Sequence, residues 1–326
     1  MCIRDSPHTP TRGLPADSTC IPDSNVTTSS PVSTASTAES AHAAPVSRFH
    51  HALTVRRAEV DAQGIVFNAH YLMYADTAVM AYWRALGVPY ASAMRRLGTE
   101  LPVRKAAVEY FASARPDDRL RIGVRLVRVG RTSVTLEAVM RREHTVLARA
   151  EVVYVCVDAA HRVPTPVPVV LRSLLERFES DGAACRLETG DWARLQADAQ
   201  PLRREVFVVE QGVPEHEEWD EADATAVHAV VYNGLGQGIA TGRLLQHAPG
   251  VGRIGRMAVD HGVRGGGHGA QVLDGLIAAA RARGDREVVL NAQQSAIGFY
   301  RGRGFAPYGE AFDEVGIPHQ AMRLVL

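Results

Sequence analysis

The feature that most constrains the fold of the N-terminal half is one long amphipathic stretch followed by several alternating segments. Apolar residues recur every three or four positions over residues 70–86, which predicts a single helix with a wide buried face. Apolar and polar residues then alternate over residues 119–126 and 132–140, and a third, more apolar strand follows over residues 146–157. One helix followed by adjacent strands predicts an α+β fold, in which an antiparallel sheet curls around the helix.

A second pattern begins after a proline-rich connector. Pro164, Pro166 and Pro168 exclude regular strand pairing, and with a short helix over residues 170–178 they predict a link between two domains. Beyond it, helical and strand-like segments alternate, which predicts an α/β domain. The expected helices lie near residues 191–206, 269–283 and 295–301, and the expected strands near 226–232, 238–246, 253–259 and 287–292. In the first half of the chain, a further strand is expected at 50–60, before the long helix.

The N-terminus differs from both halves in composition. Residues 1–48 contain no Phe, Trp or Tyr, and residues 25–44 are almost entirely Ser, Thr, Ala, Pro and Val. Such a segment buries too little apolar surface to offset its chain entropy, which predicts disorder. The sequence thus divides into a low-complexity tail (1–48), a first domain (49–178) and a second domain (179–326).

Charge and cysteine content exclude several classes of protein. The chain has 36 Lys and Arg residues against 36 Asp and Glu residues, which argues against a nucleic-acid partner bound through bulk positive charge. No apolar run reaches the roughly 18 residues of a membrane span. The cysteines are sparse and form no CxxC pair, so a reducing, cytoplasmic location is expected. They are Cys2, Cys20, Cys156 and Cys185.

Three histidines lie near the start of the first domain, at His50, His51 and His70. No second group of ligands follows at metal-binding spacing, so the sequence predicts no metal site.

The first candidate site is Asp61, which stands just before the long helix with Gly64 close by. Amide groups at a helix N-terminus are unpaired and carry partial positive charge, and glycine lets a ligand approach the backbone closely. A thioester carbonyl bound there would be polarised, and Asp61 could attack it or activate a water molecule. Aspartate before a helix is also a common turn or capping residue, so the local sequence leaves both interpretations open.

Three stretches around this site carry a family resemblance. They are residues 55–66 with Asn68 and Tyr71, residues 108–110 with 114–118, and residues 127–133. Together, residues 49–178 resemble the 4-hydroxybenzoyl-CoA thioesterase family of hotdog folds.

The resemblance implies that Asp61 is the catalytic carboxylate and that the amides of Gly64, Ile65 and Val66 orient the thioester. It also implies a site between two subunits of a homo-oligomer, a dimer or tetramer formed through this domain. The sequence departs from the family at Asn68, where some members have histidine. It departs again at Asp117-Asp118, where Gly-Asp is usual.

The second candidate site is a glycine-rich turn between the strand at 253–259 and the helix at 269–283. Its residues are Arg264, Gly265, Gly266, Gly267, His268, Gly269 and Ala270. Such a turn can direct several N–H groups at one pyrophosphate, and the helix dipole adds to the attraction. No Gly-Lys-Ser/Thr follows, so it is not a P-loop, and a plain flexible turn remains the alternative.

Further segments give the turn a family context. They are residues 254–260 and 299–305, residues 204–211 with Pro214, Asp220, Asp223 and His228, and residues 316–319. These segments resemble GNAT-type N-acetyltransferases from about residue 187 to the last residue, and within them a bacterial subfamily whose amine acceptors are mostly undefined.

This resemblance implies acetyl-CoA as a substrate rather than a permanently bound cofactor. The backbone of Met257, Ala258 and Val259 would pair with the pantetheine arm, and the turn from Arg264 to Ala270 would bind the pyrophosphate.

Candidate acid and base groups follow from the same segments. Tyr300 could protonate the departing thiolate, or be a packed aromatic residue. Glu210 is the first candidate for the general base and His228 the second, and both could be structural. The acidic run over residues 215–223 is typical of a solvated loop but could attract a cationic amine.

Both halves therefore point to CoA thioesters. The leading hypothesis is a bifunctional enzyme that hydrolyses acyl-CoA thioesters in its first domain. In its second domain it transfers an acetyl or acyl group to an unidentified amine. The alternatives are that only one domain is catalytic, or that the other domain serves dimerisation or senses CoA without turnover.

Overall fold

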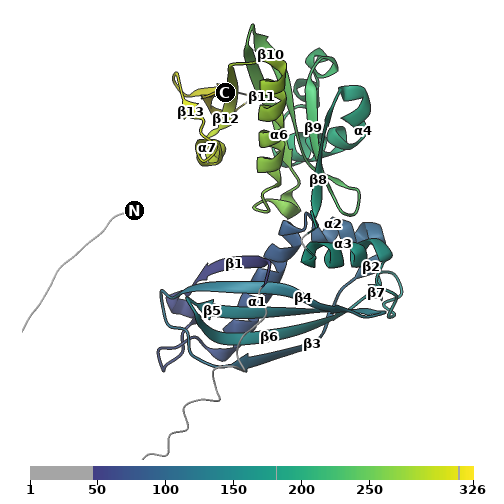
Figure 1. Ribbon diagram of the computed structural model, residues 1–326, viewed down its shortest axis with the longest axis vertical. Coiled ribbons are helices and arrows are strands. Elements are labelled where there is room, and N and C mark those ends of the chain that lie inside the picture. Colours follow the sequence, from purple (N-terminus) through teal and green to yellow (C-terminus); the bar gives the residue numbers. More distant parts are fainter. Residues whose placement is uncertain (1–46, 181, 315) are drawn as a thin grey trace, which may run out of the picture. The chain divides into compact units, whose positions relative to one another are not determined.

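The computed structural model describes residues 47–180, 182–314 and 316–326, which form two large sheets (Figure 1) and one small sheet of two strands. The predicted disordered tail falls outside these ranges except for its last two residues. None of the described helices is long and apolar enough to cross a membrane.

The first domain contains most of the elements that its pattern predicts. In chain order they are β1 (Phe49–Thr54), the 3₁₀ turn η1 (Arg57–Glu59), α1 (Asn68–Ala85), α2 (Tyr90–Leu97), β2 (Thr99–Glu100), β3 (Val103–Tyr110), β4 (Arg119–Val129), β5 (Ser133–Arg142), β6 (Thr145–Val155), β7 (Val157–Asp158) and α3 (Val169–Glu179). Five of these strands form one antiparallel sheet in the order β1-β4-β5-β6-β3, and α1 lies against one of its faces (Figure 1).

The buried face of α1 explains why this helix forms the centre of the domain. Ala75 and Ala78 are fully buried where the backbone approaches the sheet, and Tyr74 and Tyr82 fill the space on either side. A buried aromatic side chain contributes about 2–3 kcal/mol through its apolar surface. The predicted antiparallel sheet around a central helix is confirmed.

Two local differences from the sequence prediction have physical causes. The strand expected at 50–60 ends at Thr54, because the carboxylate of Glu59 accepts hydrogen bonds from the Arg56 backbone amide and side chain and stabilises a 3₁₀ turn instead. Strand β3 was not predicted, because most of its side chains on both faces are exposed and no apolar alternation marks it.

The second domain follows the predicted alternation of helices and strands. Its elements are β8 (Cys185–Gly190), α4 (Trp192–Arg203), the π-helical turn η2 (Arg204–Glu210), α5 (Glu215–Glu218), η3 (Glu221–Ala224), β9 (Val227–Asn233), β10 (Gly238–Ala248), β11 (Val251–Val259), η4 (His261–Val263), α6 (His268–Arg283), β12 (Glu287–Gln293), η5 (Gln294–Ala296), α7 (Ile297–Arg301), β13 (Ala306–Pro307), β14 (Phe312–Glu314) and β15 (Ile317–Val325). The edge strand β8 and the strands β13, β14 and β15 at the other side of the sheet were not predicted.

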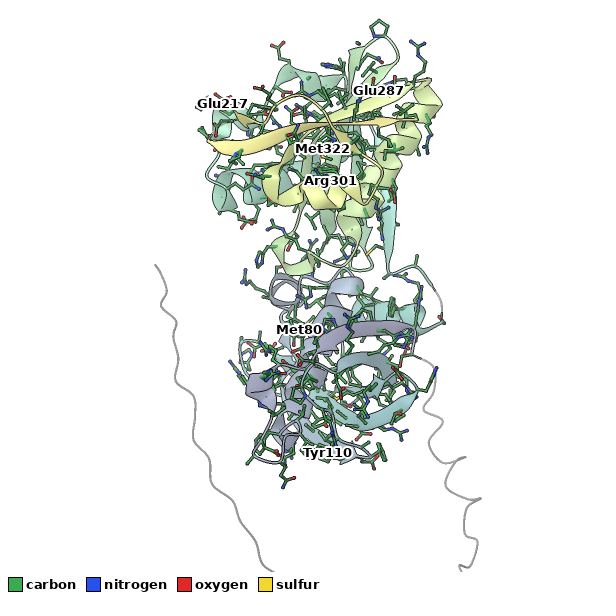
Figure 2. All side chains as sticks on the ribbon, turned by 90° about the vertical axis from the view of Figure 1, so that its left-hand side faces the viewer. Met80, Tyr110, Glu217, Glu287, Arg301 and Met322 are labelled. Atoms are coloured by element: carbon green, nitrogen blue, oxygen red, sulfur yellow. The ribbon has the colours of Figure 1, made fainter. Side chains whose placement is uncertain are left out.

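Helices cover both faces of the second sheet, whose order is β13-β15-β12-β11-β10-β9-β8. In β9, Ala229 and Val231 join the apolar cluster of α6, whereas Val230 and Tyr232 join the cluster of α4. Successive residues of a strand point to opposite faces, so α4 and α6 lie on opposite sides of the sheet. Met322 of β15 lies fully buried in the α6 cluster (Figure 2).

The feature that creates a site in this sheet is the separation of its one parallel pair. Strands β11 and β12 pair only from Val251 to Arg253, and beyond that point no β12 residue pairs with β11. The β10–β11 register shifts between the pairs Arg243–Gly255 and Thr241–Ala258, and Arg256 in this bulge has φ of 51°. The two strands thus diverge beside a strained residue, an arrangement that often accompanies function.

Two candidate active sites

The Asp61 loop connects η1 to α1 and is closed by its own backbone. The Asp61 amide donates to the Ile65 carbonyl (2.9 Å), and the Gly64 amide donates to the Asp61 carbonyl (3.0 Å). Gly64 has φ of 72°, a left-handed conformation that favours glycine. The Asp61 carboxylate accepts from the Gln63 amide (2.8 Å) and remains partly exposed.

Of the three amides that the resemblance assigned to the thioester, two already donate hydrogen bonds within the protein. Gly64 donates within the loop and Val66 donates to the Ala114 carbonyl, so both amides are occupied. Within the described residues, the amides of Ile65, Asn68 and Ala69 have no acceptor. The last two lie in the first turn of α1, where the helix dipole also favours a developing oxyanion.

A cavity of about 470 Å³ joins Asp61 to this helix end. Its wall includes Asn68, Tyr71 and Tyr110, and the Tyr110 hydroxyl donates to the Asn68 carbonyl (3.0 Å). Of the predicted residues, Asp61, Ile65 and Val66 line this cavity and Gly64 does not. Tyr71 and Tyr110 also line it, and the sequence showed them only as members of the family stretches, with no role at the site.

Glu59, two residues before Asp61, anchors the loop to the core. Its carboxylate accepts from the Tyr74 hydroxyl (2.7 Å) and the Arg56 amide (2.8 Å), and its carbonyl accepts from the Phe67 amide. Burial alone would raise the pKa of Glu59, but the hydrogen bonds from Arg56 and Tyr74 outweigh it and lower the pKa. The ionised carboxylate therefore attaches the start of the loop to α1, and the backbone carbonyl of Glu59 holds its end at Phe67.

The glycine-rich turn of the second domain keeps several amides free. Gly265 and Gly267 have φ of 82° and 88°, and no described atom lies within 4 Å of the position that a Cβ would take at either. The amides of Gly265, Gly267, His268 and Gly269 have no acceptor in the described part of the chain. This cluster matches the donor set that a pyrophosphate requires. The His268 side chain is buried, so only the backbone amide of His268 can bind a pyrophosphate.

Arg264, expected beside the pyrophosphate, is bonded to Glu210. Its two terminal nitrogens lie 2.5 and 2.6 Å from the two carboxylate oxygens, and its Nε donates to the Val259 carbonyl (3.1 Å). The hydrogen bond from Arg264 lowers the pKa of Glu210. Both oxygens of Glu210 are therefore occupied, and Glu210 does not line the cavity described next.

A cavity of about 480 Å³ lies where β11 and β12 diverge. Met257 and Tyr300 are the predicted site residues that line it. Tyr300 is 7% exposed, burial raises its pKa to about 12, and its hydroxyl has no partner among the described residues. Tyr300 thus keeps its proton at physiological pH and can donate it into the cavity.

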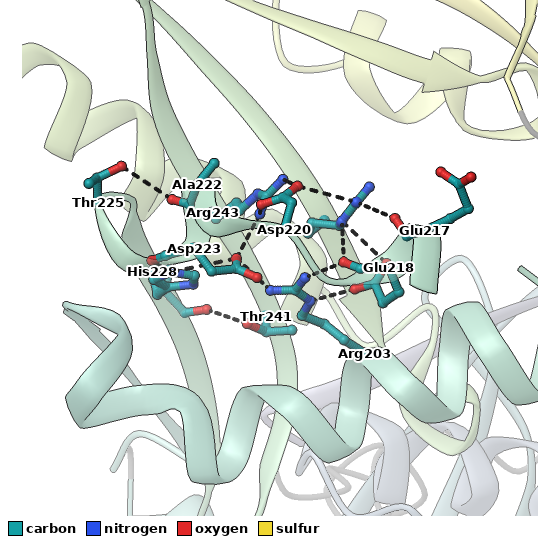
Figure 3. A network of polar contacts seen from close by, with 12 residues as sticks. Arg203, Glu217, Glu218, Asp220, Ala222, Asp223, Thr225, His228, Thr241 and Arg243 are labelled. Atoms are coloured by element: carbon teal, nitrogen blue, oxygen red, sulfur yellow. Dashed lines mark hydrogen bonds and ion pairs between the residues drawn. The ribbon is translucent and has the colours of Figure 1, made fainter. Parts of the chain in front are cut away.

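One wall of this cavity is a network of buried ion pairs (Figure 3). Arg203, only 1% exposed, donates to Glu218 (2.5 Å) and Asp223 (2.8 Å) and lies between the rings of Trp192 and Trp219. A buried arginine is tolerated only when its charge and hydrogen-bond donors are satisfied.

The network extends to the strained bulge. Arg243 donates to Asp220 (2.6 Å) and Asp223 (2.7 Å), and Arg256 donates to the carbonyls of Glu217 (2.9 Å) and Glu218 (3.2 Å). The acidic run is therefore not a solvated loop at Glu218 and Asp223, because buried arginines neutralise these carboxylates.

His228, the second candidate for the base, belongs to the same network. Its Nε2 lies 2.9 Å from the Asp223 carbonyl oxygen, which can only accept, so Nε2 carries a proton. Burial lowers the pKa of His228, and its ring packs against Trp192 at a centroid distance of 4.6 Å and an angle of 39°. The ring does not line the cavity. In the described residues no group of His, Cys, Asp and Glu side chains could hold a metal ion.

Comparison with known proteins finds one family in each half of the chain. The Thioesterase-like superfamily matches residues 55–176, and the acetyltransferase (GNAT) domain matches residues 195–326. The chain is 31% identical to the acyl-CoA thioester hydrolase YbgC of Escherichia coli over 122 residues, 37% of this chain and 88% of the relative. It is 38% identical to the uncharacterized N-acetyltransferase YjcF of Bacillus subtilis over 126 residues, 38% of this chain and 89% of the relative.

Among solved structures, Escherichia coli ElaA is 27% identical with a TM-score of 0.39, covering 43% of this chain and 98% of that chain. The two folds and their sites define a two-domain protein with one hotdog domain and one GNAT domain. The chain belongs to the Thioesterase-like superfamily through residues 55–176 and to the GNAT acetyltransferases through residues 195–326.

Proposed function

We propose that this protein is a bifunctional acyl-CoA enzyme, a thioester hydrolase joined to an N-acyltransferase. The observation that carries the proposal is that Asp61 and the N-terminal turn of α1, with its unpaired amides, border one cavity. The domain bounds that we propose remain 49–178 and 179–326. Helix α3, which ends at Glu179, is the last element before the boundary region, and β8, which begins at Cys185, is the first element after it.

For hydrolysis, the thioester carbonyl oxygen would accept hydrogen bonds from the amides of Asn68 and Ala69. Asp61 then attacks the carbonyl carbon to give a mixed anhydride that water hydrolyses, or takes a proton from the attacking water. On either route the C–S bond breaks, and the CoA thiolate leaves and takes a proton from Asp61 or from solvent. The loop bonds made by Glu59 keep the carboxylate beside the helix end. Preorganised amides of this kind are worth about 3–4 kcal/mol each in related chemistry.

For transfer, the edge of β11 at Met257, Ala258 and Val259, which no β12 residue pairs with, would pair with the pantetheine arm. The Val259 carbonyl already accepts from Arg264. The free amides of Gly265, Gly267, His268 and Gly269 would bind the pyrophosphate, which extends acetyl-CoA toward the cavity. Tyr300 would protonate the thiolate as it leaves. The acceptor is an unidentified amine, which would enter the cavity beside Tyr300.

The proposal is tested with purified full-length chain and a series of acyl-CoA esters, following free thiol with 5,5′-dithiobis(2-nitrobenzoate). Asp61→Ala should lower hydrolysis by about 10²-fold or more. Asp76→Ala, on the exposed side of α1, is the matched control and should leave hydrolysis unchanged. Equal hydrolysis by wild type and Asp61→Ala would exclude the first activity.

We further propose a homo-oligomer formed through β3, the edge strand of the first sheet. Most of its side chains are exposed, and Tyr110 at its end (Figure 2) lines the Asp61 cavity. An uncovered sheet edge is a template for pairing with another chain. Sedimentation at micromolar concentration should give a dimer or tetramer, and a monomeric mass would refute this part.

The second candidate is a protein with one catalytic domain and one domain that binds CoA without turnover. It is favoured if acetyl-CoA binds the second domain, as titration calorimetry would show, while no amine is acylated. Gly267→Glu, which places a carboxylate at the turn, should abolish that binding. The cytoplasm remains the proposed location, which fractionation of the host cell would test.

A further inference from the structure

One titratable group of the second cavity has no role so far. His319 lies on β15 and lines the cavity together with Tyr300 and Met257. It belongs to the stretch Gly316-Ile317-Pro318-His319, which the sequence analysis used only as a family marker. Its side chain is partly exposed, as a group that meets a substrate must be.

The structure fixes which nitrogen of His319 carries the proton. Nδ1 lies 2.7 Å from the Ile317 carbonyl oxygen. A carbonyl oxygen can only accept, so Nδ1 is the donor and the neutral ring keeps a free lone pair on Nε2. Nε2 has no partner in the described part of the chain.

Neighbouring elements hold the ring in this position. The β14–β15 hairpin places Phe312 opposite His319, and the two rings stack at a centroid distance of 6.0 Å and an angle of 22°. On the other side, His319 is in register with Gln293 of β12, which also lines the cavity. The imidazole is thus oriented at the divergence of β11 and β12.

We propose that His319 is the general base of amine acylation, an inference that rests on the proposed transferase function. As the amine nitrogen attacks the acetyl carbonyl carbon, the new N–C bond forms and Nε2 of His319 takes the amine proton. The C–S bond breaks, and Tyr300 gives its proton to the CoA sulfur. Exchange with water then returns a proton from the imidazolium to the solvent and one from the solvent to Tyr300.

The other basic candidates are less suited to this step. Glu210 has both carboxylate oxygens on Arg264 and lies outside the cavity lining. His228 is buried, and its Nε2 carries a proton that it donates in a hydrogen bond to the Asp223 carbonyl. Of the four acids among the described residues that line the cavity, Glu218 and Asp220 are paired with arginines, and Glu314 accepts from Asn291. The fourth, Glu217, is exposed to solvent, and its carboxylate lies 3.6 Å from Nε2 of His216.

The kinetic test uses the full-length chain, acetyl-CoA and three amine probes: spermidine, glucosamine and a lysine-containing peptide. Acetylated amine is measured by mass spectrometry. His319→Gln should lower kcat by about 10²–10⁴-fold while the acetyl-CoA Kd stays within about twofold. His247→Gln, at an exposed position outside the cavity, is the matched control and should behave as wild type.

Retention of kcat by His319→Gln would overturn the assignment while leaving the transferase intact. An acetyl-CoA Kd within about twofold of wild type shows that the second domain of His319→Gln is folded, and hydrolysis at Asp61 should persist in the first domain. If wild type acetylates none of the three amines, the transferase proposal fails instead, and with it the role of His319.

A second measurement is independent of the acceptor. Nitrogen-15 NMR of histidine-labelled protein at about pH 8.5, where imidazoles are neutral, distinguishes the two tautomers. The resonance absent from His319→Gln should show a proton on Nδ1 and none on Nε2. A proton on Nε2 would remove the lone pair on which the proposal depends and would overturn it.

Discussion

Arg264 and Glu210 form a bidentate ion pair, with N–O distances of 2.5 and 2.6 Å, between the glycine-rich turn and the end of the π-helical turn η2. The pair couples two residues that sequence motifs assigned to separate roles, pyrophosphate binding and proton acceptance. Because the guanidinium is bonded to a carboxylate, its main effect on a bound pyrophosphate is to neutralise that carboxylate.

This relationship predicts how acetyl-CoA affinity responds to the two residues. Arg264→Ala leaves the Glu210 charge unpaired near the turn, so the acetyl-CoA Kd should rise about tenfold through like-charge repulsion. Adding Glu210→Gln should recover at least half of the lost binding free energy, as measured by titration calorimetry. A double variant no tighter than Arg264→Ala would mean that Arg264 contacts the phosphates itself.

Glu210→Gln alone separates a positioning role from a catalytic one. With both oxygens bonded to Arg264, Glu210 is expected to support the turn, so kcat for amine acetylation should stay within about threefold of wild type. A fall of about 10²-fold at unchanged acetyl-CoA Kd would instead identify Glu210 as the base.

Tyr300 predicts a specific pH dependence. Burial disfavours the phenolate and raises the pKa to about 12, so the phenol remains a proton donor throughout the neutral and mildly alkaline range. Tyr300→Phe should lower kcat by about 10²–10³-fold at constant acetyl-CoA Kd. Wild type should show no loss of kcat from Tyr300 ionisation up to about pH 10. Tyr308→Phe, at an exposed tyrosine, is the control, and equal kcat in both variants would contradict the role.

Asp117 predicts a gain in stability. It has φ of 65°, in the left-handed region, at the position where the hotdog family commonly has glycine. Asp117→Gly should relieve this strain and raise the free energy of unfolding of the first domain by about 0.5–1 kcal/mol. Urea titration followed by Trp83 fluorescence measures it. Arg115→Gly, in the same turn but without positive φ, should lower stability, and the same gain in both would contradict the strain.

His228 predicts that the second domain weakens on mild acidification. Burial lowers its pKa when folded, whereas the unfolded histidine has its ordinary pKa of 6.5 and binds more protons below that value. Stability should therefore fall as pH decreases from about 6.5 toward the lower folded pKa, by at most about 1.4 kcal/mol per pH unit for this group.

Urea titrations at several pH values, followed through Trp192 and Trp219 beside Arg203, would measure this slope. His228→Gln should reduce it. Part should remain, because burial also lowers the pKa of His268. His247→Gln is the exposed control, and an unchanged slope in His228→Gln would assign the effect to other groups.

The sequence predicted elements with strong periodicity, and the structure confirms them. Helix α1 and strands β4 and β5 follow directly from apolar spacing, because each presents one continuous apolar face to a core. The exposed edge strand β3 and the strand β15 were not predicted, since neither shows a clean alternation.

The candidate site residues also fall into two groups, those that local motifs located and those that only the fold brings together. Motifs located Asp61, Tyr300 and the glycine-rich turn, because a local backbone shape needs local residues. The spacing of residues along the chain does not reveal that Arg264 binds Glu210. This spacing also assigns no role to His319, which the β14–β15 hairpin brings to the cavity.

By itself, the sequence determined two domains, their fold classes and the short segments that carry free amides, since these depend on periodicity and on glycine over a few neighbouring residues. Only the tertiary structure decided which donors remain unpaired, which charges neutralise each other and which side chains share a cavity. Those properties arise where strands distant along the chain meet, and burial there fixes partners, protonation and tautomers.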